Sequence, residues 1–359
     1  MAYHTTPYLL LFLPAALLFY QITPAKWRSY TLLIFSYFFF WSFSEKLIIY
    51  LIGTTFLTHH ICIWMDTMDK RDKRKKRVFQ LGILLLLGTI LCLKYRNFFF
   101  GNVSKLAMVL HIDWSYQDQL IFLPIGISFY TLSAIGYMAD VYWGKVKAEY
   151  SLVKTALFLG FFPVIVEGPI CRWEDVEDTL FKNESVKAEN VFKGCYRIIW
   201  GLFKKMIIAD RLAVLVDKVY VGYESYSGAV IVAAAISYTI QLYMEFSGCM
   251  DMVIGSAGLF GIRLPENFSQ PFFAKTCTDF WKRWHITLGV WFKNYIFYPV
   301  SISKTARKWN KFTRKHFKGD FGKYVARMGI AAMALFPVWI SNGLWHGPKW
   351  NYIFYGLYY

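Results

Sequence analysis

The stretch VFQLGILLLLGTILCLKYRNFFF, residues Val78 to Phe100, is the strongest single indication of fold class in this sequence. It is predominantly apolar and long enough for a helix to cross a bilayer, which takes about 20 residues. The basic cluster DKRDKRKKR, residues Asp69 to Arg77, directly precedes it. Short basic loops beside membrane spans stay in the cytoplasm and attract anionic lipid headgroups. The two stretches together predict a membrane helix that starts at the cytoplasmic side.

The composition extends this prediction to the whole chain. Hydrophobic residues make up 56% of the 359 residues, charged residues make up 18%, and the mean hydropathy is +0.34. A soluble domain carries about 25% charged residues. Apolar runs recur at Tyr8–Tyr20, Tyr30–Phe43, Leu47–Met65, Val78–Phe100, Leu120–Trp143, Leu152–Ile170, Cys195–Ile208, Gly228–Gly255, Val325–Leu344 and Asn351–Tyr359. The sequence predicts an all-α polytopic membrane protein, a single domain over residues 1–359, with about ten membrane-embedded helices, some re-entrant or interfacial.

The formal charge of +17 is concentrated in two short segments, residues 69–77 and 304–327. No nucleic-acid-binding module accompanies the charge, so we expect no nucleic-acid partner. Both segments are predicted to be cytoplasmic loops of a multi-pass cell-membrane protein. The first apolar run has no Lys or Arg before it and no clear cleavage site after it, which predicts a retained helix. The chain stops inside the aromatic run FYGLYY, and we expect the natural C-terminus to lie further on.

Two carboxylates lie in the apolar stretch QLYMEFSGCMDMVIG. Glu245 and Asp251 are six residues apart, so they do not share one face of a helix and do not form a catalytic pair. We expect each to bind a Lys, an Arg or backbone amides and to stabilise the bundle, although intramembrane acids also serve as proton paths. His59 and His60 lack the i, i+4 spacing of a helical metal site and no CxxC pair is present, so no metal is predicted.

His285 lies in the segment TDFWKRWHITLGVWF. Thr276 and Asp279, just upstream, have the spacing of a capping box and predict a helix start. On that helix Trp281 and His285 are i, i+4 and share a face. Tryptophan with Lys and Arg is typical of a membrane–water boundary, so the segment is predicted to be interfacial or re-entrant. From these residues alone, His285 is a structural histidine or a catalytic one.

His346 lies in the segment SNGLWHGPKW, within an apolar region. Gly343 and Gly347 remove side-chain bulk beside it, which lets a substrate chain or another backbone approach. Pro348 ends the regular helix. We expect a buried, neutral imidazole, which suits a general base that takes a proton from an alcohol. The alternative is a core histidine bonded to a backbone carbonyl.

Five segments in order resemble the bacterial branch of the membrane-bound O-acyltransferase superfamily, over residues 122–359. They are FLPIGISFYTLSAIGYMADVYWG (Phe122–Gly144), FFPVIVEGPICRW (Phe161–Trp173), QLYMEFSGCMDMVIGSAGLFGIRLPENF (Gln241–Phe268), the Arg283-Trp284-His285 segment, and NGLWHGPKWNYIFYG. The resemblance implies a helical fold around a central tunnel, in which an acyl thioester approaches from the cytoplasmic side and its acyl group passes to a hydroxyl. It implies that His346 is catalytic and that His285 is the second characteristic position. Residues expected to line or support the tunnel are Trp281, Arg283, Trp284, Asn342, Trp345, Glu245 and Asp251.

The segments are most similar to the alginate O-acetylation type. We therefore expect transfer of an acetyl group, from acetyl-coenzyme A or an acyl-carrier protein, toward an extracytoplasmic polysaccharide or a partner transferase. His346 would act as the base, with His285 orienting the acyl group or donating a hydrogen bond to the oxyanion, and Lys282 and Arg283 attracting donor phosphates. An acyl-histidine relay is an alternative route. D-Alanyl transfer to teichoic acid, a proton-coupled transporter and a non-enzymatic scaffold are alternative functions.

Overall fold

The computed structural model describes residues 2–69 and 72–358. Every regular element in these residues is a helix, as predicted. The chain divides into two compact units, which are described separately below. The first unit is formed by Met1–Lys70 and Pro124–Thr287, and the second by Arg71–Leu123 and Leu288–Tyr359.

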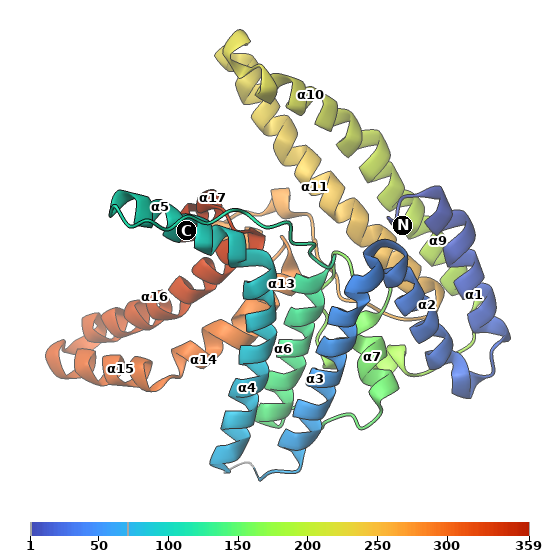
Figure 1. Ribbon diagram of the computed structural model, residues 1–359, viewed down its shortest axis with the longest axis horizontal. Coiled ribbons are helices and arrows are strands. Elements are labelled where there is room, and N and C mark those ends of the chain that lie inside the picture. The colour runs from blue at the N-terminus through green and yellow to red at the C-terminus, as the bar shows by residue number, and fades with distance from the viewer. Residues whose placement is uncertain (1, 70–71, 359) are drawn as a thin grey trace. The chain divides into compact units, whose positions relative to one another are not determined.

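The first unit contains most of the helices (Figure 1). They are η1 (Pro7–Phe12), α1 (Leu13–Ile22), η2 (Ala25–Trp27), α2 (Arg28–Ser44), η3 (Glu45–Leu47), α3 (Ile48–Asp66), α6 (Ile127–Trp143), α7 (Leu152–Gly160), α8 (Trp173–Leu180), α9 (Ala188–Leu202), η5 (Phe203–Ala209), α10 (Asp210–Val221), η6 (Tyr223–Ser225), α11 (Gly228–Leu259), η7 (Pro271–Phe273) and α12 (Cys277–Trp281). Its core is aromatic: Tyr8, Phe39 and Phe162 are fully buried and contact one another edge to face. Tyr8 also donates a hydrogen bond to Ser256 on α11, at 3.0 Å, which ties the N-terminal helices to that long helix.

Two pairs of glycines bring α9 and α11 into close contact. A Cβ on Gly201 would lie 2.5 Å from the carbonyl oxygen of Gly248, and one on Gly194 would lie 2.8 Å from that of Gly255. Helices in membranes associate through such small residues because they let the backbones approach. These glycines were not predicted from the sequence as a helix contact. Gly194 and Gly201 on α9 are nevertheless seven residues apart, as are Gly248 and Gly255 on α11.

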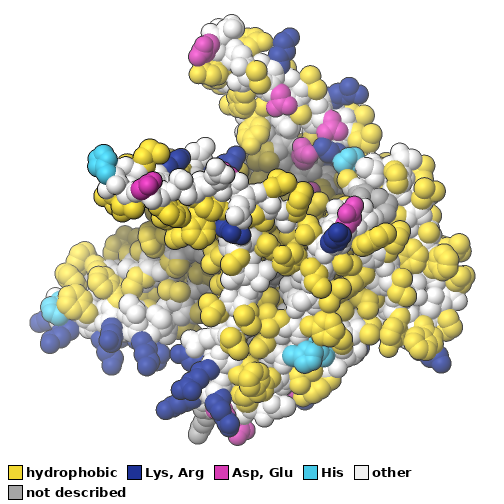
Figure 2. Space-filling view, viewed as in Figure 1, with side chains coloured by type: hydrophobic (Ala, Val, Ile, Leu, Met, Phe, Trp, Pro, Cys, Tyr) yellow, Lys and Arg dark blue, Asp and Glu magenta, His cyan; other side chains and the backbone are white. Residues whose placement is uncertain are grey.

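The second unit is built around α16. Its helices are α4 (Lys73–Ile90), η4 (Leu91–Tyr95), α5 (Arg96–Val109), most of α13 (Ile286–Phe292), η8 (Lys293–Phe297), α14 (Tyr298–Ser301), α15 (Lys304–His316), α16 (Gly319–His346) and α17 (Trp350–Tyr358). The predicted polar segment 304–323 forms α15 and the first turn of α16. Ala306 and Thr313 of α15 are buried, while its Lys and Arg side chains are exposed. Figure 2 shows these cations gathered along the exposed side of α15.

Four helical stretches are long and apolar enough to cross a membrane: Ala25–Asp66, Lys73–Val109, Gly228–Leu259 and Gly319–His346. Pro7–Ile22 is a shorter apolar helix. Other predicted runs are interrupted, because residues 152–170 contain only the short helix α7 before an irregular segment, and residues 120–126 precede α6 without helix. The all-helical membrane architecture is confirmed, while the figure of about ten membrane-embedded helices stays a prediction. Of the predicted cytoplasmic loop 69–77, residues 70–71 lie outside the described residues.

Candidate functional site

His285 lies in a break between two short helices. The helix α12 ends at Trp281, α13 begins at Ile286, and His285 has a backbone φ of +45°. Positive φ is uncommon for a residue other than glycine and usually reflects a local constraint. The predicted helix start is confirmed, since the Thr276 side chain accepts a hydrogen bond from the Asp279 amide at 3.1 Å. The prediction that Trp281 and His285 share one helix face is wrong, because the chain leaves the helical path before His285.

Asn267 binds His285 from a segment that the sequence analysis did not select as a site. The backbone oxygen of Asn267 accepts a hydrogen bond from the Ile286 amide at 2.9 Å. Its side-chain oxygen Oδ1 accepts from the Thr287 amide at 3.1 Å and from the Thr287 hydroxyl at 2.9 Å. The same Oδ1 lies 3.1 Å from Nδ1 of His285. Asn267 is 0% exposed and His285 is 9% exposed, so this cluster is buried.

These contacts determine which ring nitrogen of His285 carries the proton. The Thr287 amide can only donate, so the atom it contacts on Asn267 is the oxygen and not the amide nitrogen. An amide oxygen can only accept, so Nδ1 of His285 must be the donor. In the neutral imidazole the second nitrogen, Nε2, is then the one with an acceptor lone pair. Nε2 of His285 is therefore a hydrogen-bond acceptor.

The hydrogen bonds continue from Asn267 into another of the quoted segments. The Ile170 amide donates to the Thr287 hydroxyl at 3.2 Å, and that hydroxyl donates in turn to Asn267. Ile170 belongs to the segment Phe161–Trp173, against which α6 begins. At Gly126, where φ is +75°, a Cβ would lie 1.7 Å from the Ile165 carbonyl oxygen, so only glycine fits there. Three of the five segments that carry the resemblance thus meet around His285, and a fourth, Phe122–Gly144, packs against the segment that contains Ile170.

Aromatic rings surround the His285 cluster. Phe246 on α11 contacts the His285 ring edge to face, with centroids 4.9 Å apart. Trp284 contacts Phe268 and Tyr243 at 5.2 Å and 6.1 Å between centroids. These rings restrict access of water to the imidazole from their side.

Arg283 is held within its own segment. Its Nε donates to the Asp279 carboxylate at 2.9 Å, and this hydrogen bond lowers the pKa of Asp279. Its backbone oxygen accepts from the Ser269 amide at 2.9 Å, which joins the segment to the chain just after Asn267. Arg283 therefore stabilises the local fold, and its charge is partly neutralised by Asp279. Lys282 is exposed and Trp281 is half-buried.

Glu245 and Asp251 both form ion pairs between α11 and the α9–η5 helix. Lys205 lies 2.7 Å from Glu245, and Lys204 lies 2.6 Å from Asp251. Arg197 adds a second contact to Asp251 at 3.1 Å. Asp251 and Lys204 are each only 13% exposed at the side chain. This is the stabilising arrangement that the sequence analysis expected for the two acids.

Replacing Asp251 with alanine is expected to lower the free energy of unfolding by about 3–5 kcal/mol, because Lys204 would stay buried without its carboxylate partner and Arg197 would lose one of its two partners. The measurement is thermal or denaturant unfolding of the purified protein in detergent. Glu266→Ala is the matched control, since it removes the other partner of Arg197 from a site where Glu266 is 55% exposed. Exposed pairs contribute about 0–1 kcal/mol. Equal destabilisation by the two variants would contradict the prediction.

His346 is the last residue of α16 in the second unit, so the helix ends where the sequence predicted. Its side chain is exposed, which corrects the expectation of a buried imidazole. The physical reason is that the helix ends there, so no further turn of α16 covers the ring. Tyr352 stacks on it at 5.8 Å between centroids, and Tyr355 contacts it edge to face at 5.8 Å.

The glycines around His346 make room for α17. A Cβ on Gly343 would lie 2.3 Å from the Tyr352 carbonyl oxygen, and one on Gly347 would lie 2.9 Å from the Tyr352 ring. Of the two alternatives that the sequence left open, the approach of another backbone is the one observed at Gly343. Asn342 is buried, and its Nδ2 lies 3.5 Å from the Tyr355 hydroxyl. The residues after the histidine therefore fold back and hold it.

Lys94 places a positive charge at the end of α16. Its Nζ donates to the backbone oxygen of Trp345 at 2.6 Å and lies 5.8 Å from the centre of the Trp345 ring. Tyr95 donates to the backbone oxygen of Leu344. A cation at a helix C-terminus stabilises the unpaired carbonyls. Lys94 was not among the site residues predicted from the sequence, although it is the one lysine inside the apolar run Val78–Phe100 and an ionisable residue in such a run indicates a function.

The two histidines belong to different units, and each site is described by itself. Around His285 the structure brings together Trp284 and the previously unselected Asn267 and Thr287. Around His346 it brings together Asn342, Trp345 and Lys94. A tunnel in which the two imidazoles meet stays a prediction.

Known proteins resemble the chain along nearly all of its length. The probable alginate O-acetylase AlgI of Pseudomonas putida is 32% identical over 356 residues, which are 99% of this chain and 68% of that protein. The chain belongs to the membrane-bound O-acyltransferase family. The family model matches residues 145–315, a range that includes His285 and ends before His346.

Other relatives of this membrane-bound O-acyltransferase chain differ in the acyl group and acceptor that their names give. The peptidoglycan O-acetyltransferase of Helicobacter pylori is 28% identical over 392 residues, covering 99% of this chain and 68% of that protein. The teichoic acid D-alanyltransferase of Bacillus subtilis is 29% identical over 240 residues, covering 65% of this chain and 56% of that protein. The chain spans 64–68% of the length of the alginate O-acetylases it matches.

Proposed function

We propose that this chain transfers an acetyl group from a cytoplasmic thioester to hydroxyls of an extracytoplasmic cell-envelope polysaccharide or exopolysaccharide. In the reaction, an acceptor oxygen bonds to the thioester carbonyl carbon and the carbon–sulfur bond breaks. The acceptor proton ends on the departing thiol. The observation that carries the proposal is the alignment of 99% of the chain with relatives named as O-acetylating enzymes. The teichoic acid relative aligns with 65%, which makes D-alanyl transfer the second candidate.

In this proposal His346 is the general base. Its exposed ring is accessible to an acceptor hydroxyl, and Tyr352 and Tyr355 restrict its orientation. General bases of this kind contribute about 10²–10⁴-fold to a rate. His346 would take the hydroxyl proton as the oxygen attacks and return it to the thiolate. A relay, in which the acyl group rests on His346 before it leaves for the acceptor, uses the same residue as a nucleophile.

Of the two roles expected for His285, orienting a reacting group and donating a hydrogen bond to the oxyanion, this proposal uses orientation. A neutral imidazole with its proton on Nδ1 cannot donate a hydrogen bond to an oxyanion from Nε2. We assign His285 the positioning of a hydroxyl, which donates to Nε2, with Asn267 holding the ring. Asn267 is then a positioning residue, and Thr287 stabilises the loop that holds Asn267.

The cytoplasmic donor is proposed from the distribution of charge. Residues 72–77 and 304–327 both belong to the second unit, and α15 exposes Lys304, Arg307, Lys308, Lys311, Arg314 and Lys315. Under the positive-inside rule this side faces the cytoplasm. Its field would raise the local concentration of a phosphate-bearing donor such as acetyl-coenzyme A or an acyl-carrier protein. Partners on the other side are the polysaccharide or a transferase that carries the acetyl group onward.

A proton-coupled transporter is less well supported than an acyltransferase. Its proton path would use Glu245 and Asp251, and each of these is ion-paired with lysine. Their contacts are those of a framework between α9 and α11.

The test is donor consumption by the purified protein in nanodiscs. Acetyl-coenzyme A and a D-alanyl-carrier protein are supplied separately, each with an alginate or peptidoglycan fragment, and thiol release and acceptor mass are measured. We expect thiol release from acetyl-coenzyme A and a gain of one acetyl group per modified hydroxyl. Turnover with the D-alanyl carrier alone would favour the second candidate. Absence of thiol release with both donors would contradict the proposal.

A further inference from the structure

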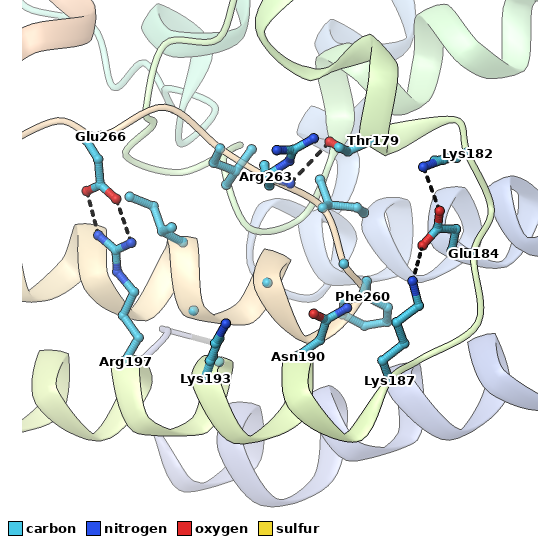
Figure 3. Close-up of a pocket in the computed structure, with 17 residues that line it drawn as sticks. Thr179, Lys182, Glu184, Lys187, Asn190, Lys193, Arg197, Phe260, Arg263 and Glu266 are labelled. Atoms are coloured by element: carbon cyan, nitrogen blue, oxygen red, sulfur yellow. Dashed lines mark hydrogen bonds and ion pairs between the residues drawn. The ribbon is translucent and has the colours of Figure 1, made fainter.

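A pocket of about 530 Å³ lies in the first unit, apart from the residues around His285 (Figure 3). It is bounded by α9, the C-terminal end of α11 and the segments 179–187 and 260–266. Five cations line it: Lys182, Lys187, Lys193, Arg197 and Arg263. Two carboxylates line it as well, Glu184 and Glu266. The pocket therefore has more cationic than anionic side chains.

The carboxylates are already paired, and one cation is not. Lys182 and Lys187 lie 2.7 Å and 2.8 Å from Glu184, and their hydrogen bonds lower the pKa of Glu184 to about 2. Glu266 lies 2.6 Å from Arg197. The Arg263 backbone amide donates to the Thr179 hydroxyl at 3.1 Å, while its guanidinium makes no ion pair with any described residue. That guanidinium is exposed and available to an anion.

The helix that forms one wall also carries an exposed apolar stripe. Phe192, Tyr196 and Ile199 of α9 are 75%, 68% and 64% exposed. Lys193 stands between the stripe and the pocket, three residues before Tyr196 and four before Arg197, so it neighbours both on the helix surface. An apolar helix face bordered by cations is the pattern of a helix at a lipid headgroup boundary.

The pocket lies at a basic end of the unit. Arg28, at the start of α2, donates to the backbone oxygen of Asn183 at 2.9 Å, and Gln21 accepts from the Val186 amide at 2.9 Å. The segment that closes the pocket thus packs on the turn between α1 and α2, which carries Lys26 and Arg28. Basic ends of membrane helices face the leaflet with anionic lipids.

We propose that this pocket binds the headgroup of an anionic phospholipid. The phosphodiester contacts Arg263 and Lys193, and an acyl chain lies along the stripe of Phe192, Tyr196 and Ile199. Guanidinium and ammonium groups together provide the charge-assisted hydrogen bonds that phosphate oxygens accept. The proposal does not depend on the acyl-transfer reaction, because none of the residues that line the pocket is assigned a part in that reaction.

The test measures lipid binding directly. Delipidated full-length chain in detergent is titrated with phosphatidylglycerol or phosphatidylcholine, and bound lipid is counted by native mass spectrometry. The double variant Lys193→Gln/Arg263→Gln removes the two cations that are proposed to contact the phosphodiester. Lys193 is also paired with Glu189, one turn earlier on α9, at 2.5 Å, whereas Arg263 makes no ion pair with a described residue. The matched control Arg211→Gln/Lys218→Gln removes the same two charges from exposed positions on α10.

We expect phosphatidylglycerol to bind at least tenfold more tightly than phosphatidylcholine, and the pocket variant alone to lose that difference. Equal weakening in the control variant, or no weakening in the pocket variant, would overturn the proposal. Competition by inorganic phosphate and by coenzyme A separates a lipid site from a site for soluble phosphates. Displacement of the lipid by inorganic phosphate or by coenzyme A at micromolar concentration would assign the pocket to a soluble phosphate compound and overturn the lipid assignment.

Discussion

His346→Ala is expected to reduce acyl transfer by about 10²–10⁴-fold, the range contributed by a positioned general base. The chain should still fold, because the ring is exposed at the end of α16 and its contacts are with the rings of Tyr352 and Tyr355. The measurement is the initial rate of thiol release per molecule of folded protein. Acceptor-free hydrolysis of the donor is measured in parallel.

His316→Ala is the matched control for this experiment. His316 is also an exposed histidine at the end of a helix in the second unit, and its Nδ1 lies 2.8 Å from the backbone oxygen of Phe312. We expect its rate to equal that of the parent. Acyl transfer by His346→Ala at the parental rate, with normal folding, would remove His346 from the mechanism. Acid quenching with labelled donor distinguishes the routes, since label on the parent and none on His346→Ala would support the relay.

Asn267→Leu is expected to reduce acyl transfer by about 10–100-fold, the effect of removing partners that orient functional histidines in metal sites. Leucine cannot accept the proton of Nδ1, so the tautomer and the orientation of His285 are both released. The Thr287 amide also loses its acceptor, which costs about 1–3 kcal/mol of folding free energy. The measurement is therefore the rate per folded molecule, together with the unfolding midpoint.

Two variants separate a positioning role from a structural one. Asn267→Asp keeps an acceptor facing Nδ1, and it gives up no hydrogen bond at Nδ2, because that atom has no partner among the described residues. We expect it to restore most of the activity lost in Asn267→Leu, with a changed pH–rate profile because a carboxylate favours the imidazolium. Thr287→Val removes a hydrogen bond to Asn267 but leaves the contact with His285, so it should lower stability with little effect on rate. If Thr287→Val and Asn267→Leu reduced the rate equally, the role assigned to Asn267 would be wrong.

Near His285 the sequence predicted the local helix start but not the contacts with distant segments. The residue type of His285, the cap at Thr276 and the neighbouring tryptophans are local features, and the structure confirms the cap. The positive φ at His285 and its contact with Asn267 arise from pairing between chain segments about 20 residues apart, which no local periodicity reports. Asn267 was within the quoted segment LPENF, but an asparagine in a loop has many local uses.

Near His346 the sequence predicted the backbone features but not the side-chain contacts. The helix end just before Pro348 and the need for glycine at positions 343 and 347 could both be predicted from neighbouring residues, because each follows from backbone sterics. The exposure of the His346 side chain could not be predicted. An apolar segment indicates a membrane or protein environment, but it does not indicate which neighbouring helices cover the helix end. Lys94 lies more than 200 residues earlier in the chain, yet it binds the carbonyl next to His346.

The sequence by itself determined that this protein is helical, that it lies in a membrane and that Glu245 and Asp251 stabilise the packing of helices. Those properties depend on composition, on run length and on the cost of an unpaired charge in an apolar setting, all of which are local. The tertiary structure alone decided which nitrogen of His285 accepts a proton, which backbone fills the space at Gly343, and how the basic pocket beside α9 is assembled. Each of these depends on atoms brought together from distant segments, because hydrogen-bond direction and close packing are set by three-dimensional contacts rather than by neighbours in the chain.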